Sequence, residues 1–416
     1  MRYLYTFGIL CYGFAIRLAA LFSEKAKLWV QGRKDIMNII QSKLADNKSE
    51  IAWFHASSLG EFEQCRPVID VFRETYPSYK VLVTFFSPSG YEIRKNYPKA
   101  DYVFYLPLDT PANARKFMDI VKPKIAFFVK YDFWFNYLNI LNKKNVPMIL
   151  FSSIFRPSQY FFKWYGGWFL KHLRFFTHAF VQNKQSEQLL KSFGVVNCSV
   201  AGDTRFDQVL TIASSPKQFP LVEKFVGDDK VILAGSSWEP DEILLKDVME
   251  KSLFSKGVKL IVAPHEIHSE RITSIENLFG SRCIRYSKMD ISTSMEGISV
   301  LIIDNIGMLS SLYMYATVAY IGGGFGKGIH NILEALAYGK PVCFGPKYKK
   351  FQEAKDIIQL GGGVSVTTVA ELQPVLDSWL YSDEEYKQVS DVCKNYVQNN
   401  KGTSAKIMKI LVDYSL

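Results

Sequence analysis

A glycine-rich segment connects an apolar stretch to a helical pattern in the second half of the chain. The apolar stretch 317–321 precedes five glycines within residues 322–328, and a helical pattern starts at Ile332, directly after His330 and Asn331. Glycine lets backbone N–H groups approach a ligand closely, and a helix start adds unpaired N–H groups and a positive dipole end. The segment therefore predicts an anion site, most simply for phosphate. A tight turn with a polar helix cap is the alternative.

One carboxylate lies close to this predicted anion site. Glu334 is one turn into the predicted helix. A bound phosphate would repel it, so we expect Glu334 to accept hydrogen bonds from sugar hydroxyls. Phosphate and sugar together indicate a nucleotide, and no lysine–serine pair of the P-loop type follows the glycines.

Short apolar stretches alternate with helical patterns along most of the chain. The predicted strands are 51–55, 80–84, 102–106, 125–129, 148–151, 179–182, 199–202, 231–234, 260–263, 300–303, 317–321 and 342–344. Such alternation is typical of parallel sheets covered on both faces. We therefore predict an α/β fold with two Rossmann-like domains facing a cleft, where ligands bind beyond the carboxyl ends of the strands.

The alternation stops at a segment rich in serine and proline, 214–220. We expect a first Rossmann-like domain at 26–213, a linker at 214–225, a second such domain at 226–385 and a C-terminal helical segment at 386–416. The remaining residues, 1–25, form a region of their own.

Residues 1–25 predict a membrane anchor. The stretches 3–15 and 18–22 are apolar and Arg17 interrupts them, which is borderline for the ~20 apolar residues of a spanning helix. Cations follow that favour the cytoplasmic face of an anionic membrane; they are Lys25, Lys27, Arg33 and Lys34. The anchor is expected to span the bilayer or to lie in its interface, with a buried first helix as the alternative.

The formal net charge of +10 favours an anionic partner. The basic residues are spread along the chain without a zinc-finger or RNA-binding motif, so nucleic acid is not expected. The six cysteines are far apart and form no C-x-x-C pair, as in reduced thiols of a cytoplasmic protein. His265 and His268 lie three apart, but no further ligand pattern accompanies them, so no metal site is expected.

Two further segments carry chemistry with more than one interpretation. Glu61 stands at a predicted helix start shortly after the strand that ends at His55. It can act as a general base on a hydroxyl or compensate the helix dipole. Segment 155–176 interleaves aromatic residues with cations, which suits a membrane interface or an acyl groove as well as a helix packed in the core.

Seven short motifs follow one another along the chain, at residues 55–61, 106–109, 134–136, 202–207, 234–238, 304–307 and 328–334. Together they resemble the 3-deoxy-D-manno-oct-2-ulosonic acid (Kdo) transferases of lipopolysaccharide synthesis. The resemblance implies a GT-B glycosyltransferase that moves Kdo from CMP-Kdo to a lipid A precursor (lipid IVA) with inversion. It also implies no metal, no cofactor apart from the co-substrate, and a place at the cytoplasmic face of the inner membrane. Two alternatives are another GT-B sugar-nucleotide enzyme, such as a different transferase or an epimerase, and a non-catalytic lipid-binding protein.

The resemblance also implies roles for single residues. Glu61 is implied as the base that deprotonates the acceptor hydroxyl. Arg205 stands where the family usually has lysine, and is implied in stabilising the transition state or in meeting the phosphate or the sugar carboxylate. For Arg205 the alternative is a surface ion pair with Asp203 or Asp207.

Some positions depart from the family pattern. Lys130 and Asp132 stand where two glutamates are common, so Lys130 is expected to meet the sugar carboxylate or an acceptor phosphate. His265 replaces an arginine, while the backbone around it is still expected to hold the cytosine. Asn305 and Met308 replace commoner threonine and glutamate. The implied donor-binding positions are Ser236, Pro264, His265, Ile306, Gly307, Met308, Gly328, His330, Asn331, Ile332, Leu333 and Glu334.

Overall fold

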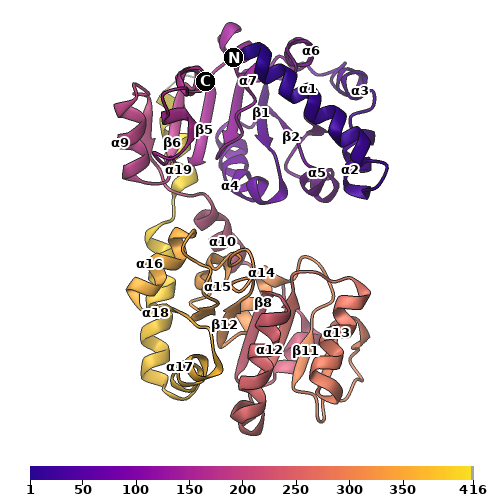
Figure 1. Cartoon of the computed structure of the whole chain (residues 1–416), viewed down its shortest axis with the longest axis vertical. Helices are drawn as coiled ribbons and strands as arrows, with labels where there is room; N and C mark the ends of the chain where they lie inside the picture. The colour runs from indigo at the N-terminus through magenta and orange to yellow at the C-terminus, as the bar shows by residue number, and fades with distance from the viewer. Residues whose placement is uncertain (414–416) are drawn as a thin grey trace. The chain divides into compact units, whose positions relative to one another are not determined.

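The structure, a computed structural model, describes residues 1–413 and divides into two compact units. Unit 1 comprises Met1–Gln208 together with the chain from Gly402 onward, and unit 2 comprises Val209–Lys401 (Figure 1). Each unit is built on one parallel sheet of seven strands. The predicted α/β class, with a parallel sheet in each half of the chain, is confirmed.

The sheet of unit 1 has the strand order β3-β2-β1-β4-β5-β6-β7. Its strands are β1 (Ile51–Ala56), β2 (Lys80–Phe85), β3 (Tyr102–Tyr105), β4 (Ile125–Val129), β5 (Met148–Ser153), β6 (His178–Val181) and β7 (Cys198–Val200). All residues of β1 and β4 are buried, as expected for central strands covered on both faces. Alternate residues of β1 enter different cores, with Trp53 on one face and Phe54 on the other.

Helices cover both faces of this sheet. They are α1 (Arg2–Ala19), α2 (Glu24–Gln31), α3 (Ile36–Lys43), α4 (Leu59–Thr75), α5 (Pro88–Arg94), α6 (Pro111–Val121), α7 (Phe135–Lys143), α8 (Gly167–Leu173), α9 (Lys184–Ser192), the first part of α10 (Arg205–Ser214), and α19 (Thr403–Asp413). The last helix belongs to unit 1 although it follows the whole of unit 2, and its apolar residues Ile407, Met408 and Leu411 lie in the same core as Phe54. Residues 414–416 of the expected C-terminal segment lie outside the described residues.

Unit 2 repeats the architecture with the strand order β10-β11-β9-β8-β12-β13-β14. Its strands are β8 (Val231–Ser237), β9 (Lys259–Pro264), β10 (Cys283–Arg285), β11 (Val300–Ile302), β12 (Val318–Ile321), β13 (Val342–Phe344) and β14 (Gly363–Ser365). Its helices are α11 (Pro220–Val226), α12 (Glu239–Val248), α13 (Ser269–Phe279), α14 (Leu309–Leu312), α15 (Leu333–Ala337), α16 (Gln352–Leu360), α17 (Val369–Tyr381) and α18 (Asp383–Asn399). The predicted linker, 214–225, contains Ser214, which is the last residue of α10. It also contains residues 220–225 of α11.

The strand order reverses at one point in each sheet. β1 lies between β2 and β4, and β8 lies between β9 and β12. At such a point the connections leave in opposite directions, which opens a crevice beyond the carboxyl ends of the strands. The loop after β1 leads to Glu61, and the loop after β8 leads to Trp238.

Some local features were not predicted from the sequence. Helix α5 begins at Pro88, because Ser87 caps the helix and Pro88 occupies its first turn. The three-residue strands β10 and β14 were not predicted, since few of their side chains are fully buried. The segment 155–176 combines both interpretations: Phe161 and Leu173 are buried in the core, whereas Trp164 is 96% exposed.

Helix α1 packs along unit 1 (Figure 1). The face of α1 that points away from unit 1 carries an exposed apolar stripe. The docked face includes Tyr12, whose ring contacts Trp29 and Phe86, and Gly13, where a Cβ would lie 2.8 Å from Leu108. The exposed stripe recurs every three or four residues and consists of Tyr3, Leu4, Phe7, Leu10, Phe14, Leu18, Leu21 and Phe22. No helix within residues 1–413 has the length and apolar character needed to cross a membrane.

The carboxylate of Asp109 connects α1 to the interior. It is fully buried and accepts a hydrogen bond of 2.6 Å from the Tyr5 hydroxyl and bonds of 3.2 and 3.1 Å from the amides of Asn136 and Tyr137, at the start of α7. Burial raises the pKa of Asp109 to about 6, and these donors oppose the rise. One buried acid therefore caps α7 and fixes the first helix.

Replacing Tyr5 with phenylalanine should destabilise unit 1 by ~1.5–3 kcal/mol at neutral pH, because an ionised buried acceptor loses a donor. A raised pKa means that folded Asp109 binds a proton between about pH 4 and pH 6 where the unfolded residue does not. The stability it confers thus falls as the pH rises through this window. The loss in Tyr5→Phe should be smaller at pH 5 than at pH 7, as measured by urea unfolding.

The matched control is Tyr3→Phe on the same helix, since Tyr3 is 90% exposed. Equal losses in both variants would contradict the anchoring role of the Tyr5–Asp109 bond.

Candidate active site

Polar loops follow the strands of unit 1 at their carboxyl ends. The side chains that gather there are Ser57, Ser58 and Glu61 after β1, Lys130 and Asp132 after β4, Ser152 in β5, Gln182 after β6, and Asp203, Thr204 and Arg205 after β7. Predicted candidates from distant parts of the sequence, Glu61, Lys130, Asp132 and Arg205, therefore lie at one edge of one sheet.

Glu61 lies in the first turn of α4 and is partly exposed. Its Oε2 accepts a hydrogen bond of 2.7 Å from the Ser58 hydroxyl. A half-buried carboxylate that is held by a neighbouring hydroxyl, at a strand switch point, can accept a proton from a substrate hydroxyl. The geometry thus fits the base role without testing it.

Asp132 ties the loop after β4 to the loop before Glu61. It is buried, and it accepts hydrogen bonds from the Ser57 amide, at 2.9 Å, and from the Ser57 hydroxyl. Burial raises the pKa of Asp132 well above its usual value, and the negative charge of Glu61 adds to this rise. The two carboxylates therefore lie close enough to influence each other, and Asp132 favours the protonated form.

Lys130 supplies a positive charge close to two of the carboxylates, those of Asp132 and Asp203. Its backbone is left-handed, with φ of 53°, and its amide donates to the Phe151 carbonyl at 3.0 Å. The charge of Lys130 lowers the pKa of both Asp132 and Asp203. A strained backbone costs ~1–3 kcal/mol and persists only where the surroundings enforce it, so this conformation holds the lysine at the site.

Arg205 forms an ion pair with Asp203, as its alternative interpretation expected. The partner is buried, however, and does not lie on the surface. Its Nε and its amide each lie 2.9 Å from the carboxylate of Asp203, which is only 5% exposed. Asp203 also accepts hydrogen bonds from Gln64 at 2.8 Å and Gln182 at 3.1 Å. Burial alone would raise the pKa of Asp203, but Arg205 and these donors hold it below its usual value. Sequence reasoning missed Gln64 and Gln182, because no pattern marks a buried glutamine at this edge.

The side chain of His55 is buried in unit 1 and does not line the site. Its ring is fully buried between two partners, the Trp134 indole N–H, which donates to Nε2 at 2.7 Å, and the Thr84 hydroxyl, 2.8 Å from Nδ1. An indole N–H can only donate, so Nε2 must be the acceptor and Nδ1 must carry the proton. Burial lowers the pKa of His55 to about 3. His55 is therefore a neutral structural residue.

In unit 2, the glycine loop packs against its own neighbours. A Cβ at Gly322 would lie 2.3 Å from the Ser236 carbonyl, and one at Gly324 would lie 2.5 Å from the Gly345 backbone. The Gly323 amide donates to buried Asp241 at 2.9 Å. Tight backbone packing therefore accounts for part of the glycine pattern. The helix expected from Ile332 is α15, which covers Leu333–Ala337.

Three aromatic rings stack beside this loop. Trp238 lies 5.0 Å from His265, and His265 lies 4.3 Å from His330, centroid to centroid. The Trp238 indole N–H also donates to His330 Nε2 at 3.2 Å. Burial, together with the nearby His265, lowers the pKa of His330 to about 4. The stack presents ring surfaces and edges, which suit a planar base.

The predicted ribose contact lies next to the stack. Glu334 accepts a hydrogen bond of 3.0 Å from the Asn331 amide, whose oxygen accepts from the Leu333 amide. Gly307 has φ of 86° in the neighbouring loop, where Ile306 is 81% exposed and Met308 is buried. Across residues 1–413, no group of three or more His, Cys, Asp or Glu side chains is arranged to hold a metal ion.

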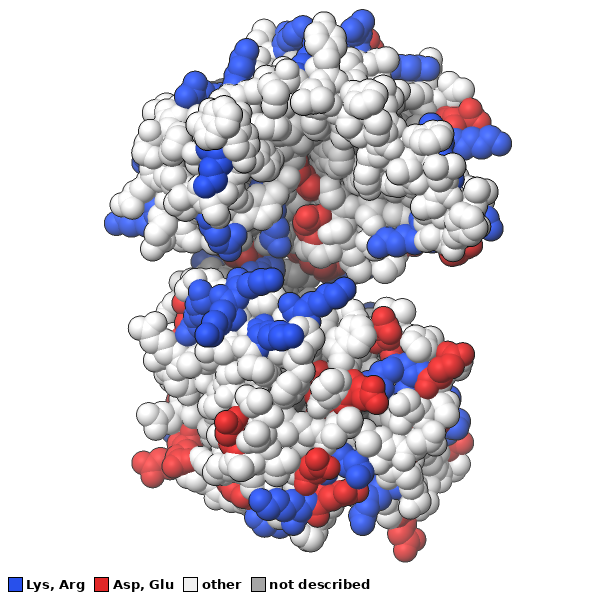
Figure 2. All heavy atoms as spheres, in the orientation of Figure 1, with Lys and Arg blue, Asp and Glu red and all other residues white. Residues whose placement is uncertain are grey.

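Basic side chains form a band on the surface of unit 2 (Figure 2). The glycine loop and the loop after β13 pack together, since the Lys347 amide donates to the Gly324 carbonyl at 2.9 Å. The exposed lysines of these two loops are Lys327, Lys347, Lys349 and Lys350. Unit 2 thus combines stacked rings, a carboxylate–amide pair and a basic rim within neighbouring loops.

Sequence comparison relates the chain to sugar transferases. The family model described as 3-Deoxy-D-manno-octulosonic-acid transferase (kdotransferase) matches residues 31–208. A 3-deoxy-D-manno-octulosonic acid transferase of Aquifex aeolicus (strain VF5) is 29% identical over 343 residues, covering 80% of this chain and 87% of the relative. A bifunctional glycosyltransferase/methyltransferase of Fusobacterium nucleatum subsp. nucleatum is 26% identical over 403 residues, covering 93% of this chain. The chain spans only 60% of that relative.

The fold is also similar to a solved structure. A crystal structure of UDP-N-acetylglucosamine 2-epimerase matches with a TM-score of 0.64 and 16% identity, covering 89% of this chain and 97% of that one. At this identity the likeness concerns the fold alone.

The His55 ring should stay neutral far below the usual histidine range. Its ring ¹⁵N signals should show the Nδ1–H tautomer and stay unchanged from about pH 8 to pH 5, because the pKa of His55 is about 3. Unfolded His55 takes up a proton near pH 6.5, so the stability that His55 contributes to unit 1 should decrease as the pH falls from 6.5 towards 3, opposite to the contribution of Asp109. A titration midpoint near pH 6.5 in the folded protein would contradict this assignment.

Proposed function

We propose that this chain, which belongs to the 3-deoxy-D-manno-octulosonic-acid (Kdo) transferase family, transfers Kdo from CMP-Kdo to a lipid A precursor such as lipid IVA, with inversion. The observation that carries the proposal is the gathering of Glu61, Asp132, Lys130 and Arg205 at the switch point of unit 1. The seven motifs, which lie in both halves of the chain, support the same reaction. The enzyme class of the relatives supports it as well.

The reaction needs a base on the acceptor side. An acceptor hydroxyl oxygen bonds to the anomeric carbon of Kdo, the bond from that carbon to the phosphate oxygen breaks, and CMP leaves with the electron pair. Glu61 takes the hydroxyl proton as the bond forms. A single displacement of this kind inverts the anomeric carbon, because the base and the leaving group lie on opposite faces of the sugar.

The other three residues act around Glu61. Asp132 positions the Ser57 loop that precedes the base. Lys130 and Arg205 are cations, which would oppose positive charge on the sugar ring but favour the negative charge of the phosphate and of the sugar carboxylate. We therefore assign both cations to anionic groups of the substrates.

Unit 2 is the proposed donor site. The Trp238–His265–His330 stack offers ring surfaces and edges to cytosine, and Glu334, held by Asn331, offers a carboxylate to the ribose hydroxyls. The loop of Ser236 and the loop from Ile306 to Met308 flank the same region in this assignment. The lysine rim suits a donor that carries a phosphate and a carboxylate.

The substitution Glu61→Gln tests the proposed reaction. It keeps the size of the side chain but removes its basicity, so transfer of Kdo should fall ~10²–10⁴-fold. CMP binding should not change, because the proposed donor residues belong to another unit. The measurement is the rate of product formation from CMP-Kdo and lipid IVA by mass spectrometry, beside calorimetric titration with CMP.

Two variants control this experiment. Glu74→Gln changes an exposed carboxylate near the end of the same helix and should keep full transfer. Glu334→Ala is the reciprocal variant and should weaken CMP binding by ~10–100-fold, since it removes a charged hydrogen-bond acceptor. Transfer by Glu61→Gln within threefold of the unaltered chain would reject the base assignment.

We further propose that unit 1 attaches to the cytoplasmic face of an anionic inner membrane through the exposed stripe of α1. A lipid acceptor requires the enzyme to work at a bilayer. The stripe is a one-sided apolar surface on a helix whose opposite face is docked, as in helices that lie in the membrane interface. Lys25 and Lys27 follow within a few residues and add electrostatic attraction.

The double variant Phe7→Glu, Phe14→Glu should therefore lose vesicle binding by at least tenfold, because each buried aromatic contributes ~1.5–3 kcal/mol. Both side chains are exposed, so the thermal stability of the protein should stay unchanged. Co-sedimentation with vesicles that contain phosphatidylglycerol measures the effect. Ile243→Glu, an exposed apolar residue of unit 2, is the control. Unchanged sedimentation of the double variant would exclude α1 as the attachment site.

A further inference from the structure

Arg33 is a partly buried cation that is not paired with an acid among residues 1–413. Three of its nitrogens donate to backbone carbonyls: Nε to Leu106 at 2.9 Å, one terminal nitrogen to Trp29 at 3.1 Å and the other to Phe86 at 2.7 Å. Burial lowers the pKa of its guanidinium to about 9. Among residues 1–413 no ion pair joins Arg33 to a carboxylate. A desolvated cation without a counter-ion is costly unless an anion meets it.

The sequence around Arg33 is built to hold it in place. Its guanidinium lies 3.9 Å from the Trp29 ring centroid and 4.8 Å from that of Phe86. Gly32 lets the turn approach Tyr105, since a Cβ there would lie 2.1 Å from the tyrosine ring. The cation is therefore fixed between α2 and α3, at the carboxyl ends of β2 and β3.

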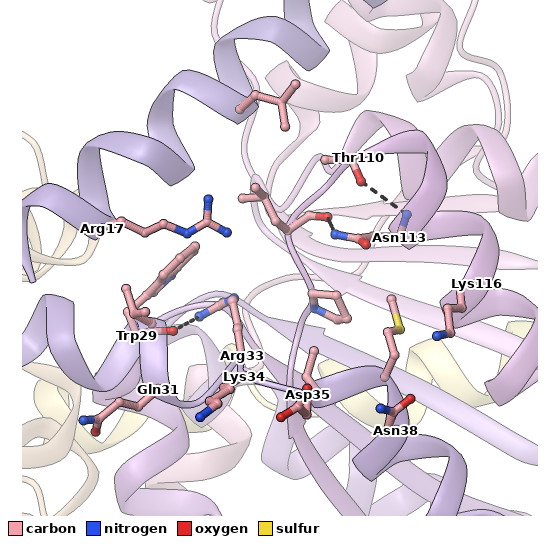
Figure 3. Close-up of a pocket in the computed structure, with 16 residues that line it drawn as sticks. Arg17, Trp29, Gln31, Arg33, Lys34, Asp35, Asn38, Thr110, Asn113 and Lys116 are labelled. Carbon is pink, nitrogen blue, oxygen red and sulfur yellow. Dashed lines mark hydrogen bonds between the residues drawn. The ribbon is translucent and has the colours of Figure 1, made fainter.

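Arg33 lines a hollow of about 670 Å³ in unit 1. The walls come from α1, from the α2–α3 turn, and from the loop and helix that follow β3. Arg17 reaches the hollow from α1, and Lys116 lies across it on α6 (Figure 3). With Lys34 the lining has four cations and one carboxylate, Asp35. None of these cations forms an ion pair within residues 1–413.

The hollow also has an apolar side that connects it to the stripe of α1. Leu10 is 51% exposed and belongs both to the stripe and to the wall of the hollow. Pro107 and Leu108 form part of the opposite wall. A ligand that fits must therefore combine an anionic group with an apolar part on the side of the helix that we place at the bilayer.

We propose that this hollow binds the phosphate-ester headgroup of an anionic phospholipid, with Arg17 and Lys116 as direct contacts and Arg33 as the fixed positive charge behind them. Guanidinium and ammonium groups are the usual partners of phosphate oxygens. The apolar side would receive the start of the acyl chains. This inference is separate from sugar transfer, since it concerns which lipid holds the enzyme at the surface.

The arrangement favours a bilayer phospholipid over the glycolipid acceptor. Trp29 lines this hollow and a second one that contains Phe86 and Ser87, so the two hollows are neighbours. Ser87 donates its amide to the Ser57 carbonyl, in the loop that leads to Glu61. The second hollow is thus on the side of the candidate base, and the Arg33 hollow is on the side of the α1 stripe.

Calorimetry with a short-chain, monomeric lipid tests the proposal without a bilayer. The full chain is titrated with dihexanoyl-phosphatidylglycerol, dihexanoyl-phosphatidylcholine and inorganic phosphate. We expect saturable binding of the phosphatidylglycerol and clearly weaker binding of the other two. Arg17→Gln and Lys116→Gln should each weaken it by about tenfold, the size typical of one charged hydrogen bond.

Arg115→Gln is the matched control, because Arg115 is the exposed neighbour of Lys116 on α6 and does not line the hollow. Equal effects of Arg115→Gln and Lys116→Gln, or equal affinity for the two lipids, would overturn the proposal. So would a Lys116→Gln variant that raises KM for the acceptor in detergent micelles while its phospholipid binding is unchanged, since the hollow would then belong to the acceptor. Binding is measured without CMP-Kdo, so a failure of the transfer assay leaves this result independent.

Discussion

The arrangement of unit 1 depends on one buried carboxylate. Asp109 receives the Tyr5 hydroxyl and two amides at the start of α7, so a single side chain joins the first helix, the loop after β3 and the helix after β4. Its neighbour Leu108 touches Gly13 of α1 and also lines the Arg33 hollow. The position of the apolar stripe and the shape of the hollow therefore share one anchoring point.

The two sheets offer different chemistry at equivalent places. Beyond β1 in unit 1 the groups are ionisable: the charge of Glu61 raises the pKa of Asp132, whereas the charges of Lys130 and Arg205 lower the pKa of nearby carboxyl groups. Beyond β8 in unit 2 the groups are mainly rings and backbone, with His330 kept neutral by burial and by its Trp238 donor. Proton transfer suits the first environment and recognition of a planar base suits the second. The two units therefore share one topology but differ in the charges beyond their strands, and this difference suits them to different steps.

Much of this could be predicted from the sequence, because fully buried parallel strands such as β1 and β4 stand out as apolar runs. The position of Glu61 followed from the rule that loops after such strands meet at one sheet edge. The pairing of Asp203 with Gln64 could not be predicted, because the two residues are 139 positions apart and no local pattern joins them. The counter-ion-free environment of Arg33 was equally hidden. Its sequence context looked like one of several cations after an apolar segment, and only the fold shows that it is partly buried.

The return of the chain end to unit 1 has a consequence for biosynthesis. The amides of Gly402 and Ser404 bind Asp207, and α19 covers the core around Phe54 with Ile407 and Met408. During translation this core stays uncovered until the whole of unit 2 has been synthesised and α19 has left the ribosome. Unit 2, whose residues are contiguous in sequence, can complete its own core earlier. A nascent chain therefore exposes apolar surface in residues 1–208 until α19 emerges, when chaperone contacts and contact with a nearby bilayer compete for it.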